Sequence, residues 1–192
     1  MKKLAVLILM CVFVFPALYA QTFTSTKEAE KVIKEFDRNN VTLFMSDVVL
    51  KRVSFEYERV IGDKGNMSIN IPFSVALDNT NDPIIDDVVN WWVGLGMKLY
   101  PTGQGTIRYY IGPEVRIYGA SGTSYVYYEN YSQQNDNDYI HSAFLLNNGM
   151  IYEPTEHFVF GVNLGLGFLS RDSKDSGITP LATPSVRMGI RF

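Results

Sequence analysis

The chain has 192 residues, the size of one ordinary domain, and its 17 basic and 20 acidic residues give a net charge of −3. It contains no run of basic residues, so nucleic acid is not an expected partner. The single cysteine, Cys11, lies in an N-terminal apolar stretch, so the rest of the chain has neither a disulfide framework nor a cysteine metal site.

Residues 1–20 have the features of a secretory signal peptide. Lys2 and Lys3 precede an apolar run that ends at Phe15, and small residues lead to a predicted cleavage site after Ala20. This run is shorter than the roughly 20 apolar residues that a membrane-spanning helix needs. We therefore expect an exported protein, whose processed chain would keep 15 basic and 20 acidic residues.

A short helix is predicted within the N-terminal segment of residues 21–40. It would run from Ser25, which can cap it, to Asn40, with its apolar residues on one side. Nothing in this segment indicates chemistry, and we expect a short surface or plug helix that precedes the main domain of residues 41–192.

From Val41 onwards, large apolar residues alternate with small or polar residues, a pattern typical of β-strands. In residues 158–168, for example, six large apolar residues alternate with neighbours that include three glycines. Seven such strands are predicted, at residues 52–61, 66–77, 88–100, 106–118, 139–152, 158–168 and 183–192. An eighth would run from Val41 to Val48, although one long bent strand from Val41 to Ile61 is an alternative.

The connections between these strands alternate in length. Residues 62–66, 101–105 and 153–156 form short connections, whereas residues 78–87, 120–138 and 172–182 form longer, polar ones. With eight strands, all short connections and both chain ends fall on one rim, as in transmembrane β-barrels. The sequence thus predicts an all-β fold, an eight-stranded antiparallel up-and-down transmembrane barrel.

Volume and charge indicate which face of the strands points inward. An eight-stranded barrel has an interior that side chains only just fill, and the large apolar set would overfill it. The opposite face is small but carries charges, and Arg or Lys facing lipid at mid-depth costs about 2–4 kcal/mol. We therefore predict a polar network in the lumen, formed by Glu56, Glu58, Lys98, Arg108, Glu114, Arg116, Arg187 and Arg191. The alternative is the solvated outer face of a soluble sheet.

Aromatic residues near the predicted strand ends fit the girdles that mark the two interfaces of a membrane barrel. The predicted belt comprises Trp91, Tyr100, Tyr109, Tyr118, Tyr152 and Phe158. The ordinary preference of aromatic residues for strands is the alternative explanation. Pro72 and Pro113 interrupt strand middles, where each removes a hydrogen-bond donor, so we expect both at bulges or near a rim.

The signal peptide, the amphipathic meander and the C-terminal residues resemble outer membrane proteins of the OmpA/OmpX type. Met188, Ile190 and Phe192 are similar to the sorting signal that the outer-membrane assembly machinery recognises in that family. The resemblance covers residues 41–192. It implies a monomer in the outer membrane of a Gram-negative-type cell, surrounded by lipid, without a metal or cofactor.

The favoured function is non-enzymatic. Arg108, Arg116 and Arg187 would pair with the three lumen glutamates and close the lumen to sizeable solutes. Function would then fall to the loops. The segment from Ser121 to Asp138 is rich in Tyr, Asn, Ser and Gln, which suits an adaptable contact surface for a surface ligand, although a merely solvated loop is equally compatible.

Two other functions remain open. A lipid acyltransferase or deacylase could use His141 and Ser142 with Asp136 or Asp138, but adjacent strand residues point to opposite faces. A channel for small apolar ligands, similar to OmpW, would need an apolar lumen and a lateral opening, for example at Pro72 or Pro113. The charged interior argues against it.

Overall fold

The computed structural model describes residues 38–62, 65–78, 88–128, 131–171 and 177–192, and between 122 and 137 it describes only the backbone. The predicted signal peptide and most of the predicted N-terminal helix lie outside the described residues. The last two residues assigned to that helix, Asn39 and Asn40, instead begin the first strand.

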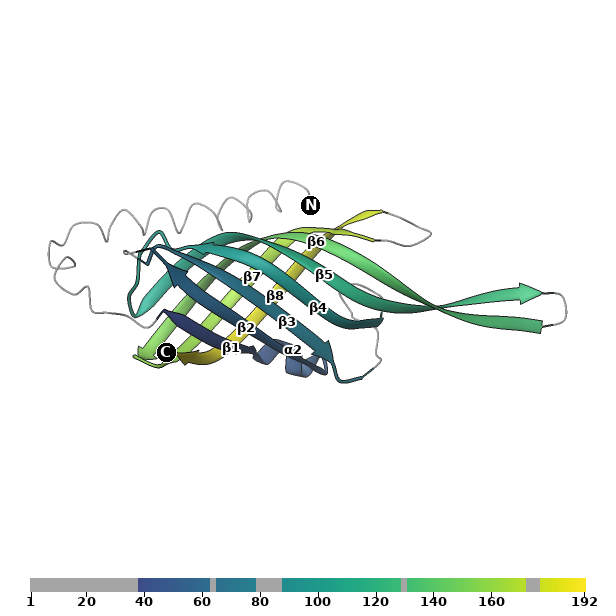
Figure 1. Cartoon of the computed structure of the whole chain (residues 1–192), viewed down its shortest axis with the longest axis horizontal. Coiled ribbons are helices and arrows are strands. Elements are labelled where there is room, and N and C mark those ends of the chain that lie inside the picture. Colours follow the sequence, from purple (N-terminus) through teal and green to yellow (C-terminus); the bar gives the residue numbers. More distant parts are fainter. Residues whose placement is uncertain (1–37, 63–64, 79–87, 129–130, 172–176) are drawn as a thin grey trace, which may run out of the picture.

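Eight antiparallel strands form a closed barrel in chain order (Figure 1). Each strand pairs with the next, and the last pairs with the first, which confirms the predicted eight-stranded meander. The three short turns and the C-terminus share one end, here called the short-turn rim, and the opposite end is the long-loop rim. The strands are β1 (Asn39–Phe44), β2 (Arg52–Ile61), β3 (Met67–Ala76), β4 (Val88–Leu99), β5 (Ile107–Tyr128), β6 (Tyr131–Thr155), β7 (Phe158–Ser170) and β8 (Ile178–Arg191).

The first strand is separate but shorter than predicted. It ends at Phe44, and the next residues form the short helix α2 (Met45–Val49). The alternative of one long bent strand is therefore wrong. The chain turns from α2 into β2 at Lys51, which adopts a φ of 55°. Glycine or asparagine usually occupies such a left-handed position after a helix, so the sequence offered no signal for this turn.

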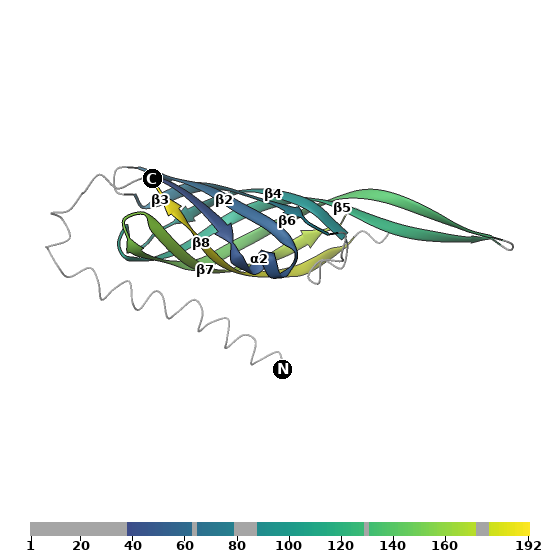
Figure 2. The ribbon, with the colours of Figure 1, turned by 90° about the horizontal axis from the view of Figure 1, so that it is seen from below.

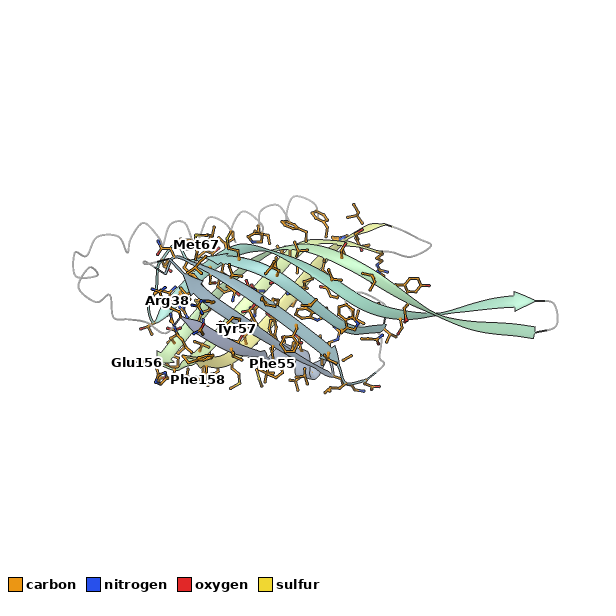
Figure 3. All side chains as sticks on the ribbon, in the orientation of Figure 1. Arg38, Phe55, Tyr57, Met67, Glu156 and Phe158 are labelled. Carbon is orange, nitrogen blue, oxygen red and sulfur yellow. The ribbon has the colours of Figure 1, made fainter. Side chains whose placement is uncertain are left out.

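The two faces of the barrel wall differ sharply in chemistry. Large apolar side chains point outward, and Leu95 in the middle of β4 is 60% exposed. Tyr57 and Met67 also lie exposed on this outer face (Figure 3). The inner face holds small and ionic residues together with buried aromatic and aliphatic ones near the two ends, and Glu114 in the middle of β5 is only 1% exposed. This arrangement is the inverse of a soluble barrel, whose apolar face fills the interior.

The two strand prolines lie at neither bulges nor rims, contrary to the expectation. Pairing is interrupted around Pro72 between β3 and β4, and around Pro113 between β4 and β5, and it resumes each time in the same register. A proline removes a donor without adding a residue, so it opens the ladder without shifting it. The register shifts lie elsewhere, after Val89 in β4 and after Tyr152 in β6.

The longest predicted loop is a paired ribbon. β5 and β6 remain in register from Ser121 opposite Asp138 to Tyr128 opposite Tyr131. Among the residues that the structure describes, their pairing with the outer neighbours reaches only Ser121 for β4 and Ser142 for β7. The two strands therefore project past the long-loop rim as an isolated hairpin (Figures 1 and 2).

Gly112 permits a close approach between β4 and β5 next to the interrupted ladder. A Cβ atom at this position would lie 1.7 Å from the carbonyl oxygen of Met97. The backbone would have to move to accommodate any side chain. Gly161 in β7 offers a comparison, because a Cβ there would find its nearest atom at 3.5 Å.

We predict that Gly112→Ala lowers the free energy of unfolding by about 1–3 kcal/mol, the usual range for forced overpacking. Gly161→Ala should leave it nearly unchanged. Urea titration followed by tryptophan fluorescence measures both variants. Equal midpoints for the two variants would mean that the close approach at Gly112 carries no structural constraint.

Candidate functional site

The lumen is organised in layers along the barrel axis. Below the long-loop rim lies an apolar cluster, which comprises Phe44, Val89, Trp92, Tyr118, Ala120, Ala143, Leu145, Leu169 and Leu181. The middle is ionic and is here called the central network; it comprises Glu56, Glu58, Lys98, Glu114, Arg116 and Arg187. Nearer the short-turn rim is a smaller cluster of Tyr100, Tyr110, Ile151 and Val159.

Lys98 on β4 connects two carboxylates of β2. Its Nζ atom lies 2.5 Å from Glu56 and 2.8 Å from Glu58. Glu56 also accepts a hydrogen bond from Arg187 Nη1 on β8 at 2.7 Å. Charges buried this completely are tolerated only when they are paired and hydrogen-bonded. The three strands are thus joined across the interior by ion pairs.

Glu114 forms the second half of the central network. Its carboxylate pairs with Arg116 Nε and accepts a hydrogen bond from Asn147 Nδ2 at 2.8 Å. Asn70 Nδ2 donates to Glu56 at 2.9 Å and approaches Glu114 at 3.4 Å, so it links the two halves. Three carboxylates and three cations occupy the network, which therefore carries no net charge.

Cation–π contacts join the central network to the apolar cluster above it. The guanidinium of Arg116 lies 4.3 Å from the Trp92 ring centroid, and that of Arg187 lies 4.3 Å from Phe44. An aromatic face attracts a cation by about 0.5–2 kcal/mol, depending on desolvation. The apolar cluster therefore covers the ionic layer on the long-loop side.

A second ionic group, here called the rim cluster, closes the short-turn rim. Arg108 and Arg191 both pair with Glu153, in the latter case at 2.8 Å. Gln104 Oε1 accepts hydrogen bonds from both arginines, while its Nε2 donates to the carbonyl of Gly65. The cluster ties the β2–β3 turn, the β4–β5 turn and the end of β6 to the last strand.

The structure places all eight predicted lumen residues in the interior, and Arg116 and Arg187 pair with lumen glutamates as expected, whereas Arg108 does not. Arg108 was expected to pair with a lumen glutamate of β2 or β5, and it pairs instead with Glu153, near the end of β6. Sequence reasoning missed Glu153 because the alternation assigns it to the short connection of residues 153–156, whereas β6 extends to Thr155. The register shift after Tyr152 is local geometry with no sequence signature.

Two members of the predicted aromatic belt are wrong. Tyr100 and Tyr118 are buried in the lumen, and the Tyr100 hydroxyl donates to Glu58. Both residues share the inward phase of their strands with Lys98 and Arg116, and that phase outweighs their position near a strand end. The other four residues, Trp91, Tyr109, Tyr152 and Phe158, are exposed or half-buried on the outer face.

His141 and Ser142 point to opposite sides of β6. His141 is buried and stacks on Tyr139 with ring centroids 6.3 Å apart, whereas Ser142 is exposed outside. This geometry does not form a serine–histidine pair. Among the described residues, no group of three His, Cys, Asp or Glu side chains is placed to bind a metal ion.

The middle of the lumen is densely filled. A cavity of about 10 Å³ lies beside Lys98, where Asn40 and Thr42 direct buried oxygen atoms that have no protein partner. That volume holds about one water molecule, which these polar groups would bind. The described part of the chain contains no helix long and apolar enough to cross a membrane.

Comparison with known proteins found no match: no family model, no curated protein and no solved structure resembles this chain closely enough to assign it. The chain is therefore classified by its architecture, an eight-stranded closed antiparallel β-barrel.

We predict that Lys98→Met lowers the free energy of unfolding by about 3–5 kcal/mol, because Glu56 and Glu58 would remain buried without their shared cation. The double variant Lys98→Met/Glu58→Gln should recover part of this loss, since Glu56 keeps Arg187. Equilibrium urea unfolding of the three proteins measures the difference. A double variant no more stable than Lys98→Met would refute the shared-cation role.

Proposed function

We propose that this protein is an outer membrane β-barrel of Gram-negative-type cells, with a closed polar lumen and a structural or surface-binding role outside the membrane. The observation that supports it most is the inverted arrangement of the wall, which has an apolar exterior around an ionic interior. The predicted signal peptide and the C-terminal residues Met188, Ile190 and Phe192 are consistent with export and outer-membrane assembly.

The apolar exterior is too extensive for a protein surrounded by water. Monomeric soluble proteins rarely expose contiguous apolar patches larger than a few hundred Å². Here the outward side chains of every strand from β3 to β8 include large exposed apolar residues. Among them are Ile69, Ile71, Phe73, Val93, Leu95, Val115, Ile117, Phe144, Phe160, Val162 and Val186. Such a surface is stable in contact with the hydrocarbon of a lipid bilayer.

The closed lumen favours a role other than transport of sizeable solutes. Ion pairs cross its middle, the apolar cluster covers them on one side and the rim cluster closes the other. Barrels that form water-filled channels have more strands than eight. Exchange with the surroundings would then take place at the rims and the outer wall.

The projecting β5–β6 ribbon is the feature that supports a surface-binding role. It extends beyond the last described residues that pair with β4 and β7. Its sequence is rich in Tyr, Asn, Ser and Gln, a composition found in adaptable contact surfaces. An isolated hairpin is at most marginally stable in water, so a function in contact would explain its length.

The membrane proposal predicts a depth-dependent cost of charge on the outer face. Leu95→Arg, at a mid-strand position, should reduce folding into lipid vesicles by about 2–4 kcal/mol. Ile107→Arg is the matched control, because Ile107 is equally exposed, at 61%, but starts β5 at the short-turn rim. Its cost should be about 0–1 kcal/mol.

Heat-modifiable gel mobility after folding into vesicles measures the folded fraction of each variant. In a water-soluble barrel, both arginines would be solvated on the surface and neither would matter. Equal folding of Leu95→Arg and the parent protein would therefore contradict the membrane proposal.

The surface-binding role predicts that removing the ribbon separates binding from folding. Deletion of residues 123–134 leaves Asn135 and Asp136 as a two-residue turn between Gly122 and Asn137, which are paired in the full chain. The shortened barrel should keep its heat-modifiable mobility. Cells that carry it should lose the signals of the full-length protein on arrays of glycans and extracellular proteins, and retention of every signal would exclude the ribbon as the contact surface.

A further inference from the structure

One section of the barrel wall lacks a strand. β1 pairs with β8 only from Arg191 to Arg187, yet β8 continues from Val186 to Ile178 towards the long-loop rim. On the other side, the pairing of β1 with β2 stops at Phe55, and β2 extends beyond it. The upper wall between β8 and β2 is therefore not closed by strand pairing.

The free edge of β8 carries prolines where a neighbouring strand would otherwise form hydrogen bonds. Phe192 exchanges two backbone hydrogen bonds with Asn39 of the first strand, so the even-numbered residues of β8 direct their backbone polar groups to this side. Pro180 and Pro184 have this parity and carry no N–H group. Proline at such positions leaves fewer donors unpaired and blocks further strand addition.

The helix α2 occupies the gap. The hydroxyl of Ser46 accepts a hydrogen bond from the Val186 N–H of β8 at 3.4 Å, and Asp47 accepts one from Ser54 of β2 at 2.5 Å. The helix thus contacts both edges of the gap (Figure 2). Its Val49 side chain is 84% exposed beside this part of the wall.

Two recesses lie on opposite faces of β8. On the outer face, Leu166, Phe168, Pro180 and Ala182 line an apolar groove. On the inner side, beneath α2, is a cavity of about 50 Å³. Leu181 of β8 lines both recesses, so β8 lies between them.

The inner cavity has a mixed lining of apolar and polar side chains, and one of its two arginines, Arg116, also pairs with Glu114. Arg52 and Arg116 line it, together with one carboxylate, that of Asp47, which already accepts hydrogen bonds from two serines. Thr183 also lines the cavity, and its buried hydroxyl has no protein partner. The volume suffices for about four water molecules, which is comparable to one phosphate group.

We propose that this gap binds an amphiphile with a phosphate headgroup, its acyl chain in the outer groove and its headgroup in the cavity beneath α2. Arginine is the side chain best suited to phosphate oxygens, and the Thr183 hydroxyl supplies a further donor. The inference rests on the proposed function, because the groove faces hydrocarbon only if the barrel spans a membrane.

Tryptophan fluorescence can report on the cavity directly. Of the two tryptophans in the chain, Trp92 lines the cavity and Trp91 lies on the outer face, so Trp91→Phe leaves one reporter. The folded protein in octyl glucoside is titrated with dodecyl phosphate, with dodecanol and with inorganic phosphate. We expect a saturable change with dodecyl phosphate at a concentration at least ten-fold lower than with the other two compounds.

Two variants test the two halves of the site. Ala182→Leu fills the outer groove and Arg52→Gln removes one cavity cation, and each should weaken binding of dodecyl phosphate at least five-fold. Val162→Leu enlarges another exposed position of the outer face and should bind like the parent protein. Because Ala182 is on the exposed outer face, its variant tests the site even where Arg52→Gln fails to fold.

Several outcomes would overturn the proposal. An equal response to dodecanol would indicate partitioning alone, an equal response to inorganic phosphate would indicate a free-anion site, and unchanged binding by Ala182→Leu would exclude the groove. Flotation of the same protein with vesicles tests the membrane barrel separately. Flotation without saturable binding would reject this site only, whereas failure to float would reject the proposed function.

Discussion

The ion pairs in the middle of the lumen are the interaction on which the rest of the barrel depends. Six buried charges stay inside only because each has an opposite partner within hydrogen-bonding distance, and an unpaired member would cost several kcal/mol. The pairs need space as well as charge balance. A Cβ atom at Gly96 would lie 2.7 Å from Asn70 Oδ1, and one at Gly94 would lie 3.2 Å from Arg116 Cγ. The inward glycines of β4 therefore provide the room in which the network assembles.

The apolar exterior follows from this interior. Strand residues alternate between two faces, so once the inward residues, which include the ionic layer and the two buried clusters, fill the lumen, the opposite residues, most of them large and apolar, have to point outward. A soluble protein would have to cover that exterior with another layer, and the described strands form a single wall with one five-residue helix beside it. The same alternation of side chains along the strands therefore places the charges inside and the large apolar residues outside. A shift of one residue in the register of a strand would exchange its inward and outward side chains. In β2 it would place Glu58 on the outside, and in β8 it would do the same to Arg187.

The alternation of apolar and polar residues predicted the strands, but it did not predict features that depend on one or a few residues. Alternation identified the strands, and the lengths of the connections distinguished one rim from the other. The alternation also correctly predicts that Lys98 and Arg116 point inward. The same alternation applies to Tyr100 and Tyr118, so their position near a strand end is a poor reason to assign them to the outer belt. The helix α2 was missed because five residues are too few for a helical period, and Glu153 was missed because its position depends on a register shift. The expectation of bulges or rims at the two prolines is wrong because the ladder opens beside each proline in mid-strand and resumes in the same register.

The layers of the lumen also determine from which side anything can reach it. At the short-turn rim, Gln104 and Glu153 hold two arginines across the opening, and above them the central network crosses the whole interior. The cavity beneath α2 lies on the far side of the Arg116–Glu114 pair, so these layers separate it from the short-turn rim. Its neighbours are α2, the free edge of β8 and the long-loop rim. A molecule that enters this cavity must therefore come through the wall beside α2 or from the long-loop side, where a lipid and a soluble anion would arrive by different routes.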